Sequence, residues 1–382
     1  MDTNLKKQYF SEELLSWYRK HRRDLPWRRS RNPYHIWISE VMLQQTRVET
    51  VIPYFHRFIE RFPTMEALAE APEEDVLKLW EGLGYYSRAR NLQGAVREVQ
   101  ERYGGTVPDT LKEISTLKGV GPYTAGAVLS IAYNKPEPAV DGNVMRVLSR
   151  YFLIEEDIMK VSTRGIMEKL AKELIPEGAA GDFNQGLMEL GAMVCTPRSP
   201  HCLTCPVMEH CAAREAGMEE ELPVKKKAKP PRPEYRIAAL IEGTGPNQGK
   251  VLIRQRPQEG LLARMWELPH TDVPFTYSPS EKAHPSIDSI PSSVSILADH
   301  LAEETIGIHP ERWYMHAEHT FSHIHWDMQV IACSLESSLL PSGSSLLMPS
   351  HYQWVDRDTM GQYAFPNVFL KILNRYFAEH SN

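Results

Sequence analysis

Four of the five cysteines in this chain lie close together, and this cluster constrains the fold more than any other feature of the sequence. The spacing is Cys195-x6-Cys202-x2-Cys205-x5-Cys211. Because four thiolates so near one another can surround a single metal centre, the loop predicts a metal site rather than a disulfide framework. The remaining cysteine, Cys333, stands inside the apolar run VIACSL and is expected to be a small buried hydrophobic residue.

The spacing also bears on which metal is bound. Structural zinc sites usually have two short Cys-x2-Cys pairs, and this loop has only the pair Cys202 and Cys205. An iron–sulfur cubane is larger and tolerates more uneven spacing. The residues alone therefore favour an iron–sulfur cluster and leave zinc as the alternative.

A cysteine cluster of this kind suits a reducing compartment. The N-terminal segment MDTNLKKQYFSEELLSWYRK has no apolar signal core, and no apolar run reaches the ~18 residues that span a bilayer. We therefore expect a cytoplasmic protein that does not associate with membranes. The net charge of −6 neither indicates nor excludes nucleic acid as a partner, because DNA responds to a local basic face rather than to the total charge.

The length of 382 residues predicts two or three domains. Apolar residues recur at helical spacing through residues 1–221, for example in VIPYFHRFIERF, which predicts an all-helical domain. The basic, proline-rich segment 222–233 is expected to be a linker. Short β-branched and aromatic runs such as RIAALIEG and KVLIRQR, with one helix near 294–305, predict an α+β domain over 234–382. Two segments rich in serine and proline are expected to be long loops: residues 271–293 and 335–350.

Residues 117–126, LKGVGPYTAG, predict a sharp turn between two helices. Gly119 and Gly121 can leave their amides exposed, and Pro122 suits the first position of the following helix. Amides at a helix N-terminus attract anions such as a DNA phosphate, although such a turn is also typical of an ordinary helix–helix connection. Further along, Asp141 opens another helix, where an aspartate is most often simply a cap.

Residues 35–51 are expected to form one helix that carries an acid in apolar surroundings. The neighbours of Glu40 at helical spacing are Ile36, Trp37 and Leu43. A carboxyl group among such side chains is partly desolvated, which raises its pKa and keeps it protonated near neutral pH. A glutamate within a helix is more often a solvated surface residue, so the residues alone leave both interpretations open.

Three motifs together resemble the MutY-type adenine DNA glycosylases of the helix–hairpin–helix endonuclease III superfamily: the cysteine spacing, LxGVGxxTA and SEVMLQQT. The resemblance is densest between residues 22 and 211. It implies an all-α helix–hairpin–helix glycosylase domain with an iron–sulfur loop, followed by an α+β Nudix-like domain. It also implies a 4Fe–4S cluster that shapes a DNA-facing loop without taking part in hydrolysis, held by Cys195, Cys202, Cys205 and Cys211.

The resemblance further implies roles for three pocket residues. Glu40 corresponds to the general acid that protonates adenine, and Asp141 to the carboxylate that stabilises the oxocarbenium-like sugar. Tyr123 takes the position, beside the sugar, where relatives with lyase activity carry the lysine that forms a Schiff base. Because tyrosine has no amine, we expect hydrolysis without strand cleavage.

An enzyme that acts on a stacked base must extrude it and fill the gap, and the resemblance implies residues for this task. Gln45 and Tyr85 are the first candidates for the wedge. The stretch RRDLPWRRSR places arginines around an aromatic residue, which suits phosphate and base contacts as well as it suits a solvated loop. The full set of predicted DNA and substrate contacts is Trp27, Arg28, Leu43, Gln45, Tyr85, Gly119, Gly121, Asn143, Gln185 and Ser322.

The second domain resembles the Nudix-like module with which this family recognises 8-oxoguanine. A Nudix hydrolase needs an Arg-Glu pair and a Glu-Glu pair to hold magnesium, and the segment ADHLAEETIGI keeps only Glu303 and Glu304. We therefore expect this domain to bind without hydrolysing. Ser322, in the sequence Phe321-Ser322-His323, is the expected reader of 8-oxoguanine.

The sequence thus predicts a monofunctional adenine DNA glycosylase of base excision repair. Its expected substrate is double-stranded DNA with adenine opposite 8-oxoguanine or guanine, on which it acts as a monomer. A bifunctional endonuclease III-like glycosylase/lyase is an alternative that does not account for Tyr123 or the second domain. A Nudix nucleotide hydrolase leaves residues 1–221 unexplained, and a non-catalytic DNA-binding protein leaves Glu40 and Asp141 without a role.

Overall fold

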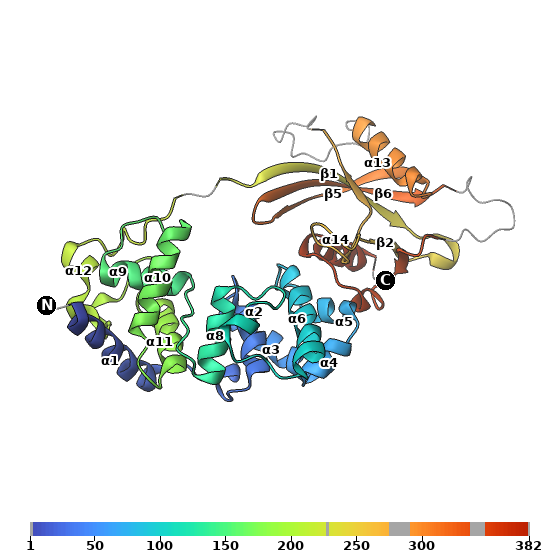
Figure 1. Ribbon diagram of the computed structural model, residues 1–382. Helices are drawn as coiled ribbons and strands as arrows, with labels where there is room; N and C mark the ends of the chain where they lie inside the picture. The colour runs from blue at the N-terminus through green and yellow to red at the C-terminus, as the bar shows by residue number, and fades with distance from the viewer. Residues whose placement is uncertain (1–2, 227–228, 275–290, 337–347, 381–382) are drawn as a thin grey trace. The chain divides into compact units, whose positions relative to one another are not determined.

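The computed structural model describes residues 3–226, 229–274, 291–336 and 348–380 (Figure 1). The chain forms two compact units. The first comprises Met1–Leu79 and Ser87–Lys227, and the second comprises Trp80–Tyr86 and Ala228–Asn382. The main division therefore falls within the basic, proline-rich segment, and a short segment between two helices of the first unit groups with the second.

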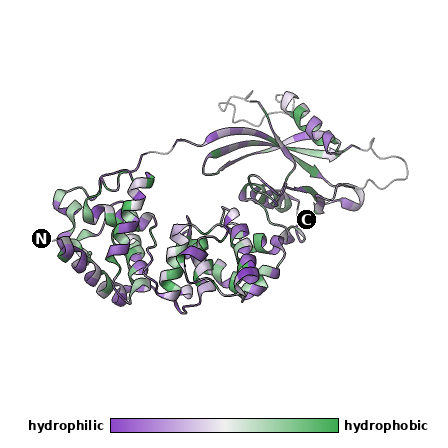
Figure 2. Cartoon of the chain, in the orientation of Figure 1, coloured by the Kyte–Doolittle hydropathy of each residue, from purple (hydrophilic) through white to green (hydrophobic). Residues whose placement is uncertain are grey.

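The first unit is built from helices along which hydrophobic and hydrophilic residues alternate (Figure 2). One group consists of α2 (Pro33–Leu43), α3 (Val48–Arg61), α4 (Met65–Glu70), α5 (Glu73–Leu79), α6 (Ser87–Tyr103), α7 (Leu111–Ile114) and α8 (Pro122–Tyr133). The other consists of α1 (Thr3–His21), α9 (Gly142–Phe152), α10 (Val161–Leu174), α11 (Ala180–Met193) and α12 (Ala212–Ala216). Among the described residues, no helix is long and apolar enough to cross a membrane.

The helix predicted over residues 35–51 is divided in the structure, so that prediction was wrong. The first part, α2, ends at Leu43, and Gln45 follows with a left-handed φ of 58°. The guanidinium of Arg88 donates to three carbonyl oxygens at the end of α2, including that of Gln44 at 2.5 Å. These carbonyls have no partner within the helix, and a cation there stabilises its end. The cap comes from a residue far away in the sequence, which helical periodicity does not reveal.

A close contact within the first unit brings two candidate site residues together. Gly126 in α8 packs so tightly that an added Cβ would lie 1.9 Å from the carbonyl oxygen of Pro138. The chain that leads into α9 therefore runs directly against α8. Because Asp141 caps α9 and Tyr123 lies in the first turn of α8, this contact sets their separation.

The second unit contains a mixed sheet in which, within the described ranges, the strand order is β3-β2-β1-β6-β5, with β4 beside β1 and β7 beside β2. Its strands are β1 (Arg232–Glu242), β2 (Val251–Gln255), β3 (Trp266–Glu267), β4 (His270–Asp272), β5 (Ile308–Thr320), β6 (Ile324–Leu335) and β7 (Tyr352–Val355). Strands β1 and β6 are parallel, with Ala238 opposite Val330, and the other pairs are antiparallel. The α+β prediction is confirmed.

Two helices cover opposite faces of this sheet, α13 (Pro291–Glu303) and α14 (Asn367–Glu379) (Figure 1). Successive side chains of β6 point to opposite faces of the sheet, so the strand contributes to the hydrophobic core on both faces. Met328 packs on the α14 side, and Cys333 packs on the α13 side. Cys333 is fully buried, as predicted. Helix α13 confirms the helix expected near 294–305, whereas α14 was not singled out from the sequence.

The two predicted Ser- and Pro-rich loops lie mostly outside the described residues. Among their described residues, 271–272, 291–293 and 335 belong to strands or helices, whereas 273–274, 336 and 348–350 lie outside them. The first begins within β4 and ends in the first turn of α13, and the second begins at Leu335, the last residue of β6. Strand β5 begins at Ile308.

The contact at Gly126 yields a stability prediction. Gly126→Ala is expected to destabilise the fold by about 1–3 kcal/mol, the usual cost of overpacking, since the opposing atom belongs to the backbone. In the matched control, Gly165→Ala in α10, the added Cβ meets no atom within 4 Å, and we expect a gain of about 0.5–1 kcal/mol. Thermal unfolding of the full chain measures both, and equal shifts for the two variants would contradict the packing argument.

Candidate active site

A pocket of about 370 Å³ lies in the first unit, where α2, α8, α9 and α11 contribute side chains. The pocket brings together most of the predicted site residues, which come from segments far apart in the sequence: Trp27, Arg28, Glu40, Leu43, Tyr123, Asp141, Asn143 and Gln185. The fold therefore places these residues around one pocket.

Glu40 supplies a buried carboxyl group to this pocket. Only 5% of the residue is exposed, because its helix neighbours Ile36 and Trp37 are themselves buried. Its Oε2 accepts a hydrogen bond from the hydroxyl of Tyr123 at 2.5 Å. Burial raises the pKa of Glu40 to about 7, against the opposing effects of Tyr123 and of the nearby charge of Arg28. The group is therefore protonated in a large fraction of molecules near neutral pH, which agrees with the buried one of the two interpretations that the sequence left open.

Asp141 lies in the same pocket and also caps α9. Its Oδ1 accepts from the backbone amide of Val144, and its Oδ2 accepts from the Asn143 side chain, both at 2.8 Å. Burial raises the pKa of Asp141, whereas these hydrogen bonds and the charge of Arg146 favour its ionised form. Capping and pocket lining, which the sequence presented as alternative interpretations, are therefore combined in one residue.

Tyr123 connects the two sides of the pocket. Its hydroxyl contacts Glu40 and lies 3.3 Å from Sδ of Met188 in α11. Burial and the carboxyl of Glu40 raise the pKa of Tyr123 well above its ordinary value, so the hydroxyl keeps its proton and donates it to the hydrogen bond. Among the residues that the structure describes, no lysine lines this pocket.

Glu189 is a pocket residue that the sequence analysis missed. Its carboxylate is 1% exposed and accepts paired hydrogen bonds from the guanidinium groups of Arg23 and Arg28 at 2.9–3.2 Å. Burial opposes ionisation, but these hydrogen bonds lower the pKa of Glu189 to about 2. Two arginines of the basic stretch therefore build the pocket wall. Glu189 follows Gln185 by four residues, so both lie on one face of α11. This spacing could have identified Glu189 as a pocket residue from the sequence.

Other predicted DNA contacts of the first unit do not line this pocket. Gln45 is exposed in the turn after α2, and its positive φ projects it from the end of that helix. Gly121 is the exposed N-cap of α8. Gly119 has a φ of 74°, and an added Cβ would lie 2.6 Å from Cβ of Asn91, so both conformation and space require glycine. The hairpin thus presents open backbone at the start of α8.

The two remaining predicted contacts belong to the second unit. Tyr85 is 44% exposed, with a φ of 48°. Ser322 lies exposed in the turn between β5 and β6, and its hydroxyl donates to the Tyr85 hydroxyl at 3.1 Å. The ring of Phe321 packs edge-on against Trp326 at 4.8 Å, which anchors this turn to the core.

The four clustered cysteines line a single small cavity together with apolar residues that include Val194 and Met208. Arg150 is buried and donates to Sγ of Cys195 at 3.3 Å. Four thiols around one cavity, with a cation as hydrogen-bond donor, fit a 4Fe–4S cluster. Such a group would be held by Cys195, Cys202, Cys205 and Cys211.

Helix α9 links this cavity to the pocket. The guanidinium of Arg146 donates to the backbone oxygen of Cys195 at 2.7 Å and to Oδ1 of Asn143 at 2.9 Å. Asn143 in turn donates to Asp141. A continuous hydrogen-bonded chain therefore runs from the first cysteine to the carboxylate of the pocket, and the cysteine loop can hold that carboxylate in place.

The raised pKa of Glu40 yields a prediction about stability. A proton bound more tightly in the folded state stabilises it below pH 4.5, and this contribution is lost as the pH rises to about 7. Glu40→Gln does not titrate, so between pH 5 and pH 8 its stability should improve relative to the natural chain by about 2–3 kcal/mol. Melting temperatures at both pH values measure this, with Glu13→Gln on the exposed side of α1 as the control. Parallel pH dependence of the natural chain and Glu40→Gln would rule out a raised pKa.

Comparison with known proteins agrees with this geometry. Residues 38–177 match the HhH-GPD superfamily of base excision DNA repair proteins, residues 195–211 the iron–sulfur binding domain of endonuclease III, and residues 244–375 the NUDIX domain. The adenine DNA glycosylase of Homo sapiens is 35% identical over 96% of this chain and 74% of the human protein. That of Schizosaccharomyces pombe is 36% identical over 70% of each chain.

Among solved structures, that of a thermostable thymine-DNA glycosylase is 34% identical and has a TM-score of 0.51, covering 56% of this chain and 99% of that chain. The predicted fold class and the predicted iron–sulfur cofactor are thereby confirmed. The helical unit with its cysteine loop, the second unit and the extent of these matches lead to one conclusion. The chain belongs to the adenine DNA glycosylase family of base excision repair proteins.

Proposed function

We propose that this chain hydrolyses the N-glycosidic bond of adenine paired with 8-oxoguanine or guanine in double-stranded DNA. The observation that carries the proposal is the buried carboxyl of Glu40, whose pKa of about 7 suits a proton donor at neutral pH. The same pocket contains a second carboxylate, Asp141, which accepts hydrogen bonds from the Val144 amide and the Asn143 side chain rather than from an arginine pair. Two carboxyl groups in different environments can take different roles in one reaction.

In the proposed reaction, Glu40 transfers its proton to the adenine while the bond between the base and the sugar breaks. The bonding electrons leave with the base, which is neutral because it has gained the proton. Positive charge develops on the sugar, and the negative charge of Asp141 stabilises it. A water molecule then forms the new bond to the sugar and gives a proton back to Glu40, which restores the starting state.

The absence of lyase chemistry is part of the proposal. A Schiff base needs an amine beside the sugar, whereas the residue at this position is Tyr123, whose hydroxyl is engaged by Glu40. The pocket lining within the described residues includes arginines but no lysine. We further propose that the chain acts on DNA as a monomer.

The proposed reader of the opposite base is Ser322 in the second unit. Its hydroxyl is exposed in the turn between β5 and β6, and the neighbouring ring of Phe321 fixes that turn on the core. A hydroxyl both donates and accepts, so it can discriminate the altered edge of 8-oxoguanine from guanine. Arginines and glycine amides of the first unit would contact the phosphates.

A single-turnover assay tests the reaction. Duplexes with adenine opposite 8-oxoguanine, guanine and thymine are incubated with excess protein, and base release is followed before and after alkali. We expect release from the first two duplexes, with strand breaks only after alkali, and at least a hundredfold slower release with Glu40→Gln, because general acid catalysis contributes about 10²–10⁴-fold. Glu40→Gln should still bind the duplex. Rapid release by Glu40→Gln, or equal release opposite thymine, would refute the proposed acid or the proposed specificity, respectively.

Recognition of the opposite base has a separate test. Ser322→Ala should reduce the preference for 8-oxoguanine over guanine up to about tenfold, since one hydrogen bond contributes roughly 0.5–1.5 kcal/mol. The ratio of single-turnover rates on the two duplexes measures this preference. Ser292→Ala, which removes an exposed hydroxyl from α13, is the matched control. A ratio unchanged by Ser322→Ala would exclude Ser322 as the reader.

A further inference from the structure

Two carboxylates face each other across the strands β5 and β6, in a part of the second unit that the proposed glycosylase reaction does not use. Glu318 in β5 is directly opposite Asp327 in β6. Directly opposed residues of an antiparallel pair point to the same face of the sheet, and like charges at such positions destabilise the pairing. A positive charge between the two carboxylates would remove this repulsion.

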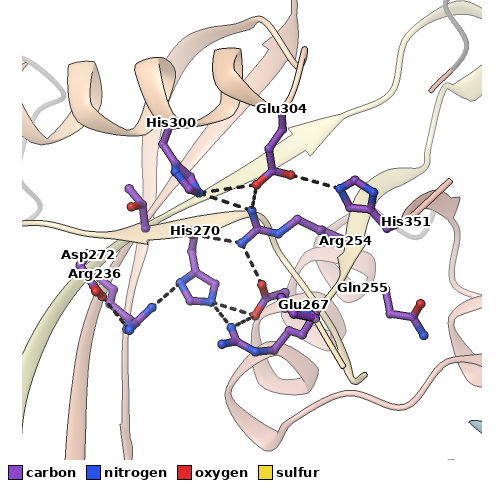
Figure 3. A pocket seen from close by; sticks show the side chains of 12 residues that line it. Arg236, Arg254, Gln255, Glu267, His270, Asp272, His300, Glu304 and His351 are labelled. Carbon is purple, nitrogen blue, oxygen red and sulfur yellow. Dashed lines mark hydrogen bonds and ion pairs between the residues drawn. The ribbon is translucent and has the colours of Figure 1, made fainter. Parts of the chain in front are cut away.

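Other carboxylates of the second unit obtain such a charge from arginine. In the cavity beside β2 and β3, Glu267 and Glu304 both accept from the guanidinium of Arg254 (Figure 3). Within the described part of the chain, neither of the two opposed carboxylates on β5 and β6 forms an ion pair with a lysine or an arginine, and both lie beside the imidazole of His316. The charges are therefore balanced differently in these two places.

His316 brings an imidazole nitrogen to the two carboxylates. It precedes Glu318 by two residues in β5, so both side chains lie on one face of the strand. Its Nε2 lies 2.8 Å from Oδ1 of Asp327 and 3.8 Å from Oε1 of Glu318, and the three ligand atoms all lie within 4.8 Å of one another. One nitrogen and two oxygens from two strands thus converge on one point.

The separations between these atoms suit a divalent transition-metal ion. Bonds of Zn²⁺ to imidazole nitrogen and carboxylate oxygen are about 2.0–2.2 Å long, which places tetrahedral ligands roughly 3.3–3.6 Å apart. The separations in the structure lie on both sides of this range, so shifts of about 1 Å or less would bring all three atoms to bonding distance. Imidazole suits Zn²⁺ and carboxylate groups suit Mn²⁺, and a site with three protein ligands leaves a position for water.

The sheet positions the three side chains in advance. Ala317 and Met328 are also directly opposite each other, but they point to the other face, where they are buried in the core with α14. These buried residues hold the register of the strands, and ligands on strands are placed more precisely than ligands on loops. The side chains of His316, Glu318 and Asp327 are 35%, 51% and 25% exposed, so an ion in solution can reach them.

We propose that His316, Glu318 and Asp327 form a binding site for one divalent transition-metal ion, Zn²⁺ or Mn²⁺, which joins β5 to β6. The ion neutralises the two opposed carboxylates. It also links the strands that lead into and out of the turn that carries Ser322. The site is structural, and it requires neither the cysteine loop nor the active-site pocket.

The test uses Mn²⁺ as the probe, because bound Mn²⁺ is detected by electron paramagnetic resonance. The full chain is used with its cluster loaded, so that the cysteines of the loop do not compete for metal. We expect one Mn²⁺ per chain, with a dissociation constant of about 1 mM or less, the limit of weak oxygen-ligand sites. Zn²⁺ should displace this ion more readily than Mg²⁺ does, because Zn²⁺ binds mixed nitrogen and oxygen ligands more tightly than Mn²⁺ and Mg²⁺ prefers oxygen ligands.

Two variants assign the ion to these residues. His316→Gln should weaken Mn²⁺ binding at least tenfold, since even residues that only orient a metal ligand contribute about 10–100-fold. It should also remove the imidazole nitrogen coupling from the pulsed resonance spectrum of the bound ion. The matched control is His309→Gln, which removes an exposed histidine from the same strand and should leave the dissociation constant unchanged.

The proposal is overturned if the natural chain binds no Mn²⁺, which would mean that a proton on His316 balances the carboxylates by itself. It is also overturned if folded His316→Gln keeps the affinity of the natural chain, or if Mg²⁺ displaces Mn²⁺ as readily as Zn²⁺ does. Circular dichroism shows whether the variants fold. If His316→Gln does not fold, the nitrogen coupling in the natural chain decides, and its absence counts against the site.

Discussion

The arrangement of the active-site pocket depends on one carboxyl group that is kept away from water. Burial of Glu40 makes its ionised form unfavourable, and the Tyr123 hydroxyl provides the one direct hydrogen bond that its side chain receives in the described structure. An arginine free to pair with Glu40 would remove this effect. The neighbouring Arg28 is instead bound to Glu189, which keeps its charge directed at another carboxylate. The Arg28–Glu189 pair thus allows a protonated acid to persist in a pocket that also contains cations.

The arrangement of the pocket also depends on Asp141, which must hold a fixed position relative to Glu40. Its place is determined at both ends: Gly126 lets the preceding chain lie against α8, and the side chains of α9 reach the cysteine loop. Arg146 and Arg150 are four residues apart and therefore lie on the same face of that helix. A cluster bound by the loop would hold these arginines and, through them, the start of α9. A cluster that takes no part in the reaction would therefore still influence the geometry of the pocket.

Local sequence spacing determined much of what this protein is. The cysteine intervals predicted one metal centre, and the apolar neighbours of Glu40 made a raised pKa one of two interpretations. The expectation of hydrolysis without strand cleavage came from the family resemblance, through Tyr123 at the position of a lysine. Alternating and helical periodicities distinguished an all-α unit from an α+β unit. These features are carried by residues within one or two turns of helix or one loop, so the chain order alone places them together.

Only the tertiary structure decided which partners the charged residues take. Arg88 fixes the end of α2, and Glu189 fixes the pocket wall as the partner of Arg28. In the second unit, Arg254 lies between the carboxylates of Glu267 and Glu304. The sequence shows that such charges exist but not where they meet. Ion pairs and caps between distant segments depend on how the helices and strands pack, and their energies change with burial, which is defined only in the folded chain.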